Sequence, residues 1–242
     1  MNSISIVIPA FNEEKRLPAT LSAVFNYLAA RRWELAEVLV VDDGSSDGTC
    51  AVAERLVPLH AGLRLLKNPG NRGKGYSVRH GVLEARGEWV LFTDADLSAP
   101  IDELDKLLEA ARTGGATVAI GSRALDRTLI TVHQSWFREN AGRLFNLLVR
   151  VLTSLPFQDT QCGFKLFEAR AAREVFRRQR LERFGFDVEV LFIARLLSHK
   201  TIEVPVRWSH SEGTKVRMLR DSLAMFTDLV RVRWNQVRGR YR

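Results

Sequence analysis

The sequence predicts an α/β protein built on a mostly parallel sheet with helices on both faces. Through the first half of the chain, short apolar runs alternate with segments that have the apolar spacing of helices, which is the pattern of βαβ units. The runs are apolar at successive positions, as expected for strands covered on both sides. With 242 residues, 46% of them hydrophobic, the chain is long enough for one large α/β domain and short for two.

The first half of the chain shows this alternation most clearly. Residues 4–9 form the first apolar run, and residues 17–31 follow with helical spacing. Asp47 stands where an N-cap is expected for a later helix. Further strands are predicted at 37–41, 63–67, 89–93 and 117–121, and further helices at about 47–56, 74–85 and 101–111.

After Arg123 the pattern changes. Residues 124–138 are polar and irregular, which predicts a loop that could close over a substrate and exclude water. The remaining predicted elements are strands at 164–167 and 201–206 and helices at 140–155, from 169, at 186–197 and at 216–236. The last helix carries an apolar stripe that consists of Leu219, Leu223, Phe226, Val230 and Trp234.

The charge balance favours an anionic partner. The formal net charge is +8 and the isoelectric point is about 10.0, which suits nucleic acid, an anionic membrane or phosphorylated substrates. Aromatic platforms or a basic recognition helix would mark a nucleic-acid binder, and neither is found, so no nucleic-acid partner is expected. The two cysteines form no CxxC pair, and the chain shows no signal peptide and no apolar run of about 18–20 residues. We therefore expect a cytoplasmic location.

Two carboxylates follow the predicted strand 89–93 directly. Asp94 and Asp96 are spaced i, i+2, so strand geometry would point both to the same side. Ends of parallel strands are where ligands bind in open α/β sheets, and carboxylate oxygens suit Mg²⁺ or Mn²⁺. The pair therefore predicts a site for a divalent cation that carries a diphosphate. The alternative is an Asp-rich turn without a ligand.

Three other segments carry polar residues at predicted strand or helix ends. The segment after residues 4–9 has no G-x-G-x-x-G pattern, which disfavours a dinucleotide fold of the usual kind. Asp42 and Asp43 could accept hydrogen bonds from a ribose or a base, although Asp also favours turns. Gly73 and Gly75 flank Lys74 at a predicted helix start, where glycines allow a phosphate to approach closely.

The second half offers weaker signals. Asp159 is a lone acid in a polar loop, and spacing alone does not distinguish a solvated side chain from a catalytic one. The basic residues of this half form either a solvated face or a set of contacts to anionic groups: Arg123, Arg138, Arg143, Lys165, Lys215, Arg217 and Arg220.

Taken together, the motifs resemble the GT-A fold of family 2 glycosyltransferases. Four of them occur in the expected order in the first half, at residues 6–14, 40–45, 71–75 and 94–96. Later segments resemble the dolichyl-phosphate β-glucosyltransferase branch, with the related mannose synthases sharing them more loosely. These segments are 121–123, 135–138, 159–167, 186–189 and 213–215.

The resemblance implies a single catalytic domain over 1–242, with a nucleotide-sugar half at 1–123 and an acceptor half at 124–242. It implies an inverting transfer of a hexose, glucose from UDP-glucose, to a polyprenyl phosphate such as dolichyl or undecaprenyl phosphate. The alternatives are the same reaction with GDP-mannose, or transfer to a soluble glycan acceptor. Both substrates are polyanions, so the chemistry depends on positioning and on charge neutralisation.

The resemblance also implies roles for individual residues. The nucleotide-sugar pocket would be lined by Pro9, Phe11, Glu13, Asp43, Lys74, Asp94 and Asp96. Asp94 and Asp96 would hold Mg²⁺ or Mn²⁺. The acceptor phosphate would contact Arg123, Arg138, Lys165 and Lys215, and the catalytic group would comprise Asp159, Asp96 and Arg123. Asp159 would orient the attacking phosphate.

Relatives of this branch carry membrane anchors, and the lipid acceptor has to be reached. We expect the apolar helices at 140–155 and 216–236 to lie in the membrane interface, which would make the protein peripheral on the cytoplasmic face of a membrane. The alternatives are that both helices pack on the core or form a homodimer interface.

Overall fold

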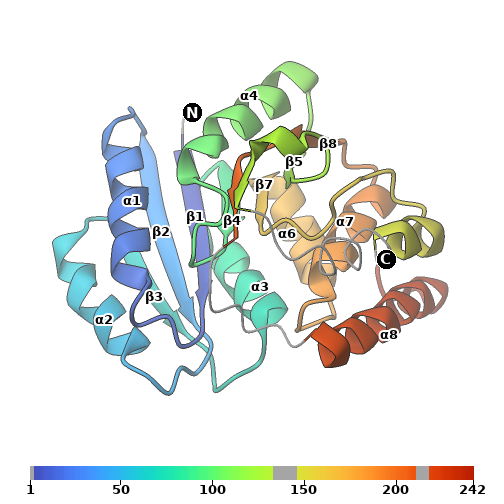
Figure 1. Ribbon diagram of the computed structural model, residues 1–242, viewed down its shortest axis with the longest axis horizontal. Coiled ribbons are helices and arrows are strands. Elements are labelled where there is room, and N and C mark those ends of the chain that lie inside the picture. Colours follow the sequence, from blue (N-terminus) through green and yellow to red (C-terminus); the bar gives the residue numbers. More distant parts are fainter. Residues whose placement is uncertain (1–2, 133–145, 211–217) are drawn as a thin grey trace.

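The computed structural model describes residues 3–132, 146–210 and 218–242, with side chains of the last segment from Met225 onward. Its centre is a seven-stranded sheet in the order β3-β2-β1-β4-β7-β5-β8 (Figure 1). Each neighbouring pair is parallel except those that involve β7, which is antiparallel to β4 and to β5. The strands are β1 (Ser3–Ala10), β2 (Leu35–Asp42), β3 (Leu63–Lys67), β4 (Trp89–Thr93), β5 (Val118–Ser122), β7 (Phe164–Glu168) and β8 (Thr201–Pro205). The predicted α/β class with a mostly parallel sheet is confirmed.

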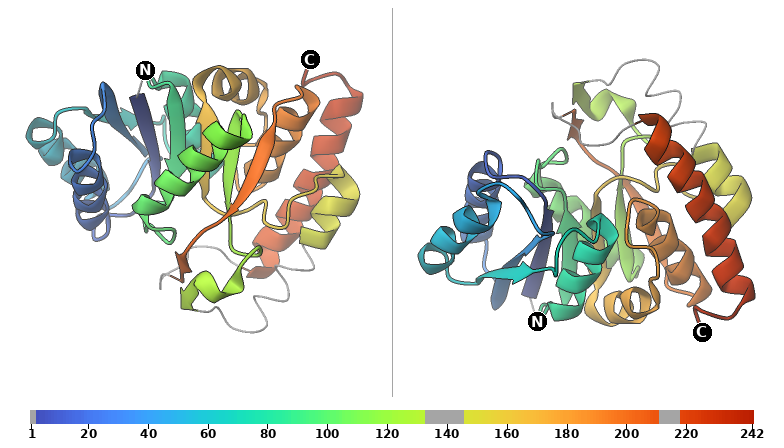
Figure 2. Two further views of the ribbon diagram at one scale, coloured as in Figure 1. Left: turned by 90° about the horizontal axis from the view of Figure 1, so that it is seen from above. Right: turned by 90° about the horizontal axis from the view of Figure 1, so that it is seen from below.

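Helices cover both faces of the sheet (Figure 2). The face with α1, α2 and α4 packs on one apolar cluster, and the face with α3, α6 and α7 packs on another. A helix over 146–153 and α8 lie side by side beyond α7 (Figures 1 and 2). The helices are α1 (Leu17–Ala29), α2 (Thr49–Leu56), α3 (Lys74–Glu84), α4 (Leu104–Gly114), α6 (Ala169–Arg178), α7 (Phe186–Leu196) and α8 (Met218–Val237).

Strand β1 shows why the apolar runs are continuous. Ile4, Ile6 and Ile8 point into the cluster under α1, while Val7 points into the cluster under α3. All four are fully buried. A strand in the middle of a two-sided sheet therefore needs apolar residues at successive positions.

Two predictions about local structure need correction. The loop predicted at 124–138 contains a short 3-10 turn, η3 (Arg127–Leu129), and strand β6 (Ile130–Val132), which pairs with β9 (Trp208–Ser209). Residues 133–138 lie outside the described residues. Helix α2 begins at Thr49, two residues after Asp47, whose carboxylate accepts a hydrogen bond from the Thr49 N–H at 2.9 Å.

The segment after α8 is attached to the core through a buried hydrogen-bonded group. The Tyr241 hydroxyl donates to Glu189 on α7 at 2.6 Å, and the other Glu189 oxygen accepts the N–H groups of Arg180 and Leu181 at 3.0 and 2.7 Å. Burial raises the pKa of the Glu189 carboxyl. Helix α8 is thereby connected to the loop between α6 and α7.

Candidate functional site

The ends of β1, β2, β4 and β5 meet at one edge of the sheet, because parallel strands end on the same side. The loops after β1 and β2 bond to each other there. The Asn12 N–H donates to Ser45 Oγ at 2.9 Å, and the Glu13 N–H donates to Thr49 Oγ1 at 2.7 Å. Pro9, Phe11 and Glu13, which the sequence assigned to the nucleotide pocket, all lie in or beside this paired region, half-buried.

The Asp43 side chain is hydrogen-bonded to the loop that leads into α3. It is buried, and its carboxylate accepts hydrogen bonds from Asn68 Nδ2 at 2.8 Å and from the N–H groups of Arg72 and Gly73 at 3.0 and 2.8 Å. Those donors belong to the loop that leads into α3. Asp43 therefore fixes the start of α3.

The neighbouring residue Asp42 has a carboxylate oxygen that accepts no hydrogen bond from the described residues. Asp42 is also buried, and one of its oxygens accepts the Ser45 N–H at 3.3 Å. Among the described residues, its Oδ1 is one of a few buried side-chain atoms without a hydrogen-bond partner. Buried polar atoms of this kind need an explanation, and an absent ligand is one.

The glycines before and within α3 have a different purpose from the one the sequence suggested. A Cβ atom on Gly73, whose φ is +110°, would lie 2.5 Å from the Glu182 carbonyl oxygen. A Cβ atom on Gly75 would lie 2.7 Å from Cβ of Phe186. Both glycines make room for the chain between α6 and α7 and for the first residue of α7.

Lys74, between these glycines, reaches the carboxylates after β4. Its Nζ lies 2.5 Å from Asp94 Oδ1, and its side chain is 20% exposed. Burial alone would lower the pKa of Lys74, but Asp94, Asp187 and Asp96 together raise it above the ordinary lysine value. The ammonium group is therefore held charged among three carboxylates.

Asp94 and Asp96 belong to a turn and not to the strand. Strand β4 ends at Thr93, and the Leu97 N–H donates to the Asp94 carbonyl oxygen at 3.1 Å. Leu97 has a φ of +45°. The strand alternation that was used to place both carboxylates on one side does not apply here, although both act on the same lysine ammonium.

Gly163, just before β7, lies directly against this turn. A Cβ atom at this position would be 2.1 Å from Asp94 Oδ2 and 2.5 Å from its Cγ. Only glycine leaves space for the Asp94 carboxylate in its observed position. The sequence signal for this role was the glycine itself, in the segment that precedes a predicted strand.

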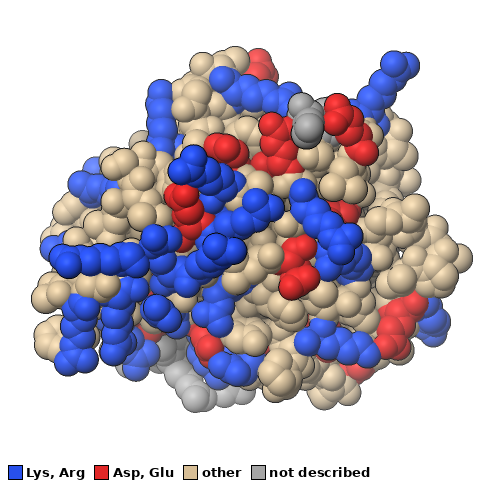
Figure 3. All heavy atoms as spheres, turned by 180° about the vertical axis from the view of Figure 1, so that it is seen from behind, with Lys and Arg blue, Asp and Glu red and all other residues tan. Residues whose placement is uncertain are grey.

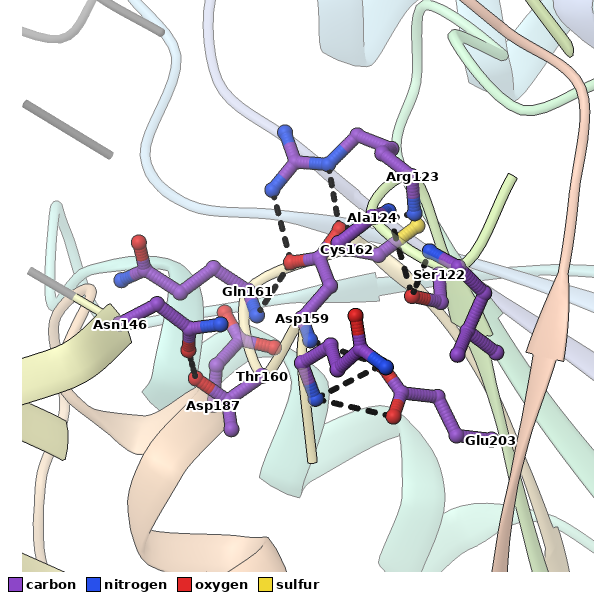
Figure 4. Close-up of polar contacts among 12 residues, drawn as sticks. Ser122, Arg123, Ala124, Asn146, Asp159, Thr160, Gln161, Cys162, Asp187 and Glu203 are labelled. Atoms are coloured by element: carbon purple, nitrogen blue, oxygen red, sulfur yellow. Dashed lines mark hydrogen bonds and ion pairs between the residues drawn. The ribbon is translucent and has the colours of Figure 1, made fainter. Parts of the chain in front are cut away.

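Asp159 and Arg123 form the second polar centre, at the end of β5 (Figure 4). Arg123 donates through Nε at 2.6 Å and Nη2 at 2.9 Å, and its backbone N–H donates at 3.0 Å. The Gln161 N–H adds a fourth donor at 3.1 Å. Burial would raise the pKa of Asp159, but the Arg123 guanidinium outweighs burial and lowers the pKa to about 2.

This saturated carboxylate cannot serve as a proton acceptor near neutral pH. Its effect is to hold the Arg123 guanidinium, whose centre also lies 5.4 Å from the Trp208 ring centroid. Within the described residues Asp159 takes Nε and Nη2 of Arg123, so Nη1 remains for an anionic group. The sequence identified both residues but not their pairing, and it missed Trp208.

Lys165 is placed differently from the other predicted phosphate contacts. Its side chain is fully buried in β7, where Nζ pairs with Asp187 of α7 and donates to the Cys162 carbonyl oxygen at 2.8 Å. The Lys165–Asp187 pair therefore fixes the chain next to Gly163 and does not face an acceptor. Arg138 and Lys215, the other two predicted contacts, lie outside the described residues.

The carboxylates after β4 fit a divalent cation by their chemistry. Carboxylate oxygens are the ligands that Mg²⁺ and Mn²⁺ prefer, and both side chains are only partly buried. Within the described part of the chain, no group of three or more His, Cys, Asp or Glu residues could hold a metal by itself. A cation at Asp94 and Asp96 would therefore take its remaining ligands from a diphosphate and water, and Lys74 would have to yield its contact with Asp94.

The mixed, mostly parallel sheet carries carboxylates after β4 and a fixed guanidinium after β5, and this is the architecture of a GT-A glycosyltransferase. The family described as Glycosyl transferase family 2 matches residues 5–176, and the chain belongs to it. It is a glycosyltransferase.

Curated relatives over nearly the whole chain are named dolichyl-phosphate beta-glucosyltransferases. The chain is 37% identical to the one from Mus musculus over 250 residues, which covers 99% of this chain and 77% of that protein. It is 38% identical to the one from Drosophila melanogaster over 237 residues, covering 93% and 73%. A third, from Trichomonas vaginalis, is 35% identical over 237 residues, covering 95% and 72%.

Solved structures share the fold at low sequence identity. Glucosyl-3-phosphoglycerate synthase from Mycobacterium tuberculosis in complex with phosphoglyceric acid has a TM-score of 0.71 at 17% identity, covering 96% of this chain and 80% of that chain. A structure of the same synthase with Mn²⁺, UDP-glucose and phosphoglyceric acid has a TM-score of 0.68 at 18% identity, with 96% and 79% covered. Mannosyl-3-phosphoglycerate synthase from Rubrobacter xylanophilus has a TM-score of 0.69 at 18% identity, with 99% and 75% covered.

Proposed function

We propose that this enzyme transfers glucose from UDP-glucose to a polyprenyl phosphate, with inversion at the anomeric carbon. The observation that carries the proposal is that two charged centres, a carboxylate pair and a guanidinium held by Asp159, follow strands that end at one edge of the sheet. Asp94 and Asp96 follow β4, and the Arg123–Asp159 pair follows β5. Such an arrangement suits a cation-bound diphosphate on one side and a phosphate nucleophile on the other.

On the donor side, Asp94 and Asp96 would hold Mg²⁺ or Mn²⁺, which would neutralise the leaving diphosphate. Lys74 would exchange its contact with Asp94 for one with the diphosphate. The loops after β1 and β2 would take the nucleoside, and the unpartnered oxygen of Asp42 supports this residue, rather than Asp43, as the acceptor for a base or ribose donor. The Mn²⁺ and UDP-glucose named for a structural neighbour support the same choice of donor.

On the acceptor side, the Arg123 guanidinium would bind the phosphate monoester. A charge-assisted contact of this type contributes roughly 1.5–3 kcal/mol. The monoester is largely anionic at neutral pH because its second pKa is about 6, so it needs orientation rather than deprotonation. An acceptor oxygen forms the bond to the anomeric carbon as the bond to the diphosphate breaks and UDP leaves.

The outer surface of α8 supports a lipid acceptor. Phe226, Val230 and Trp234 are 43%, 52% and 55% exposed and recur at every fourth residue on one helical face. Leu147 and Val151, on the neighbouring helix over 146–153, are 54% and 69% exposed. Within the described part of the chain, every helix is too short or too polar to cross a membrane.

Basic side chains accompany this apolar surface. Figure 3 shows Lys and Arg gathered on the half of the molecule that carries α8. The exposed arginines in and after the second half of α8 are Arg231, Arg233, Arg238, Arg240 and Arg242. Each basic residue near an anionic membrane contributes about 1 kcal/mol. We propose peripheral binding to the cytoplasmic face of a membrane, with the apolar stripe in the interface.

A transfer assay tests the proposal. The protein is incubated with UDP-glucose or GDP-mannose and with polyprenyl phosphate or 3-phosphoglycerate, in the presence of Mg²⁺, Mn²⁺ or a chelator. We expect a β-linked glucosyl lipid from UDP-glucose, abolished by the chelator and by Asp96→Ala. Product only from GDP-mannose, or only on 3-phosphoglycerate, would replace the proposed donor or acceptor.

A further inference from the structure

We infer that Glu203 is a positioning residue for the transfer, because its carboxylate fixes the loop that presents the Asp159–Arg123 pair. The inference rests on the proposed function for the role of that pair. Glu203 lies on β8, the edge strand of the sheet, opposite Ile120 of β5. None of the motifs that mark the family in this chain includes it.

The geometry is that of a carboxylate enclosed by backbone donors. Oε1 and Oε2 accept the Gln158 N–H at 3.0 and 2.9 Å, and Oε1 also accepts the Asp159 N–H at 2.7 Å. Figure 4 shows Glu203 on one side of this loop and Arg123 on the other. The carboxylate of a residue on a solvated face would be hydrogen-bonded to water, whereas that of Glu203 accepts hydrogen bonds from two peptide groups.

These bonds decide where the Asp159 side chain points. Residues 158 to 161 form no helix or strand, so regular backbone pairing does not hold them. Glu203 binds the peptide groups from the β8 side, and the Asp159 carboxylate is then directed at Arg123. Hydrogen bonds to an ionised acceptor are about twice as strong as neutral ones, so Glu203 attaches the loop to β8 while Arg123 attaches it to the end of β5.

The consequence is a selective effect on the acceptor. A glutamine at this position replaces one oxygen by an NH₂ group, which faces peptide donors instead of accepting from them. The loop keeps at most the two bonds to the remaining oxygen and loses the negative charge and the third bond, so its attachment weakens and the Arg123 guanidinium is held less firmly. The carboxylates that would bind the donor follow β4, which lies on the other side of β7 from β5, so donor binding is preserved.

The kinetic test compares the wild type with Glu203→Gln, Glu203→Asp and Glu109→Gln, the last an exposed carboxylate on α4. We expect Glu203→Gln to lower kcat/KM for polyprenyl phosphate by ten- to a hundredfold, since displacement of a binding group by about 1 Å has effects of this order. Its dissociation constant for UDP with Mn²⁺ and its Tm should stay near the wild-type values. Glu203→Asp keeps the charge on a shorter side chain, so its kcat/KM should lie between those of wild type and Glu203→Gln. The kcat/KM of Glu109→Gln should match that of the wild type.

Two kinetic or stability results would overturn the inference. One is a kcat/KM of Glu203→Gln for polyprenyl phosphate within twofold of wild type. The other is a parallel loss of UDP affinity and Tm in that variant, which would mark a general structural role. A spectroscopic readout separates this outcome from failure of the proposed function. The Arg123 Nε–H signal in a nitrogen-15 NMR spectrum reports the Asp159 contact whatever the substrate is. It should shift in Glu203→Gln and lose its response to added inorganic phosphate, and an unchanged signal would also overturn the inference.

Discussion

Gly163 and Asp94 are in such close contact that a methyl group on Gly163 would lie 2.1 Å from Asp94 Oδ2. The two residues adjoin neighbouring strands, since Gly163 directly precedes β7 and Asp94 directly follows β4. The position of the Asp94 carboxylate in the proposed donor site therefore depends on the absence of a side chain at Gly163, next to the neighbouring strand.

We expect Gly163→Ala to displace the Asp94 carboxylate and to weaken binding of UDP with Mn²⁺ by about tenfold, because forced contacts of this kind cost about 1–3 kcal/mol. Isothermal titration calorimetry measures the affinity directly. Gly114→Ala is the control, since a Cβ atom there would meet only Ile202 Cδ1, at 3.5 Å. Equal UDP affinity in the two variants would show that Asp94 can move without loss.

The Asp159–Arg123 pair should make stability depend on pH in the acidic range. Asp159 has a pKa of about 2 in the folded protein and an ordinary value of 3.8, so folding depresses it. Its contribution, about 2 kcal/mol, is present above about pH 5 and is lost progressively as pH falls through 2. Urea unfolding of the wild type and Asp159→Asn between pH 7 and pH 3 should give curves that converge on acidification.

Glu109→Gln, an exposed substitution, should follow the wild type throughout that range. A difference between wild type and Asp159→Asn that stays constant down to pH 3 would mean that the loss comes from packing and not from ionisation.

Removing the buried lysine of β7 should be costly. Lys165→Met leaves Asp187 buried without its cation, and breaking such a pair costs about 3–5 kcal/mol. Denaturant unfolding measures the change. The double variant Lys165→Met with Asp187→Leu should recover much of the stability, because no uncompensated charge remains. A single variant as stable as wild type would contradict the assignment of Lys165 to the core.

The apolar face of α8 should govern membrane binding. Trp234→Glu changes a half-exposed side chain, so we expect little effect on Tm and a clear loss of flotation with liposomes that contain anionic lipid. Leu59→Glu is the matched control, since Leu59 is 71% exposed in the turn directly after α2, and Figure 1 shows α2 at the opposite end of the molecule from α8. If Trp234→Glu leaves flotation unchanged, the apolar face of α8 does not bind the membrane. If the substitution dissociates a dimer, that face is a dimer interface.

The fold was largely predictable because its strands are apolar at successive positions. Strand β1 and helix α1 lie within a few residues of their predicted bounds. The β6–β9 pair was not predicted, since strands of two or three residues carry no detectable periodicity. Predicted helix 216–236 corresponds to α8, and of predicted helix 140–155 the structure describes 146–153 as helical.

The site was predictable in its residue types and less so in their contacts. Asp94 and Asp96 directly follow a buried strand, as the sequence predicts, and their binding of a cation stays a prediction. The resemblance predicts Lys165 as a contact to the acceptor phosphate, whereas the structure buries its side chain fully. Its burial depends on Asp187, which is 22 residues away in sequence and supplies the opposite charge. Such pairings depend on tertiary structure, so sequence spacing does not reveal them.

The antiparallel strand β7 has a consequence for how this enzyme could change its substrates. Because β7 separates β4 from β5, the proposed donor and acceptor centres stand two strand spacings apart, about 10 Å. Backbone hydrogen bonds, with Phe92 and Ile120 both opposite Lys165, set that interval. Loops at either centre can therefore diverge in sequence, and accept a different sugar or a different phosphate, while the distance between the reacting groups stays constant.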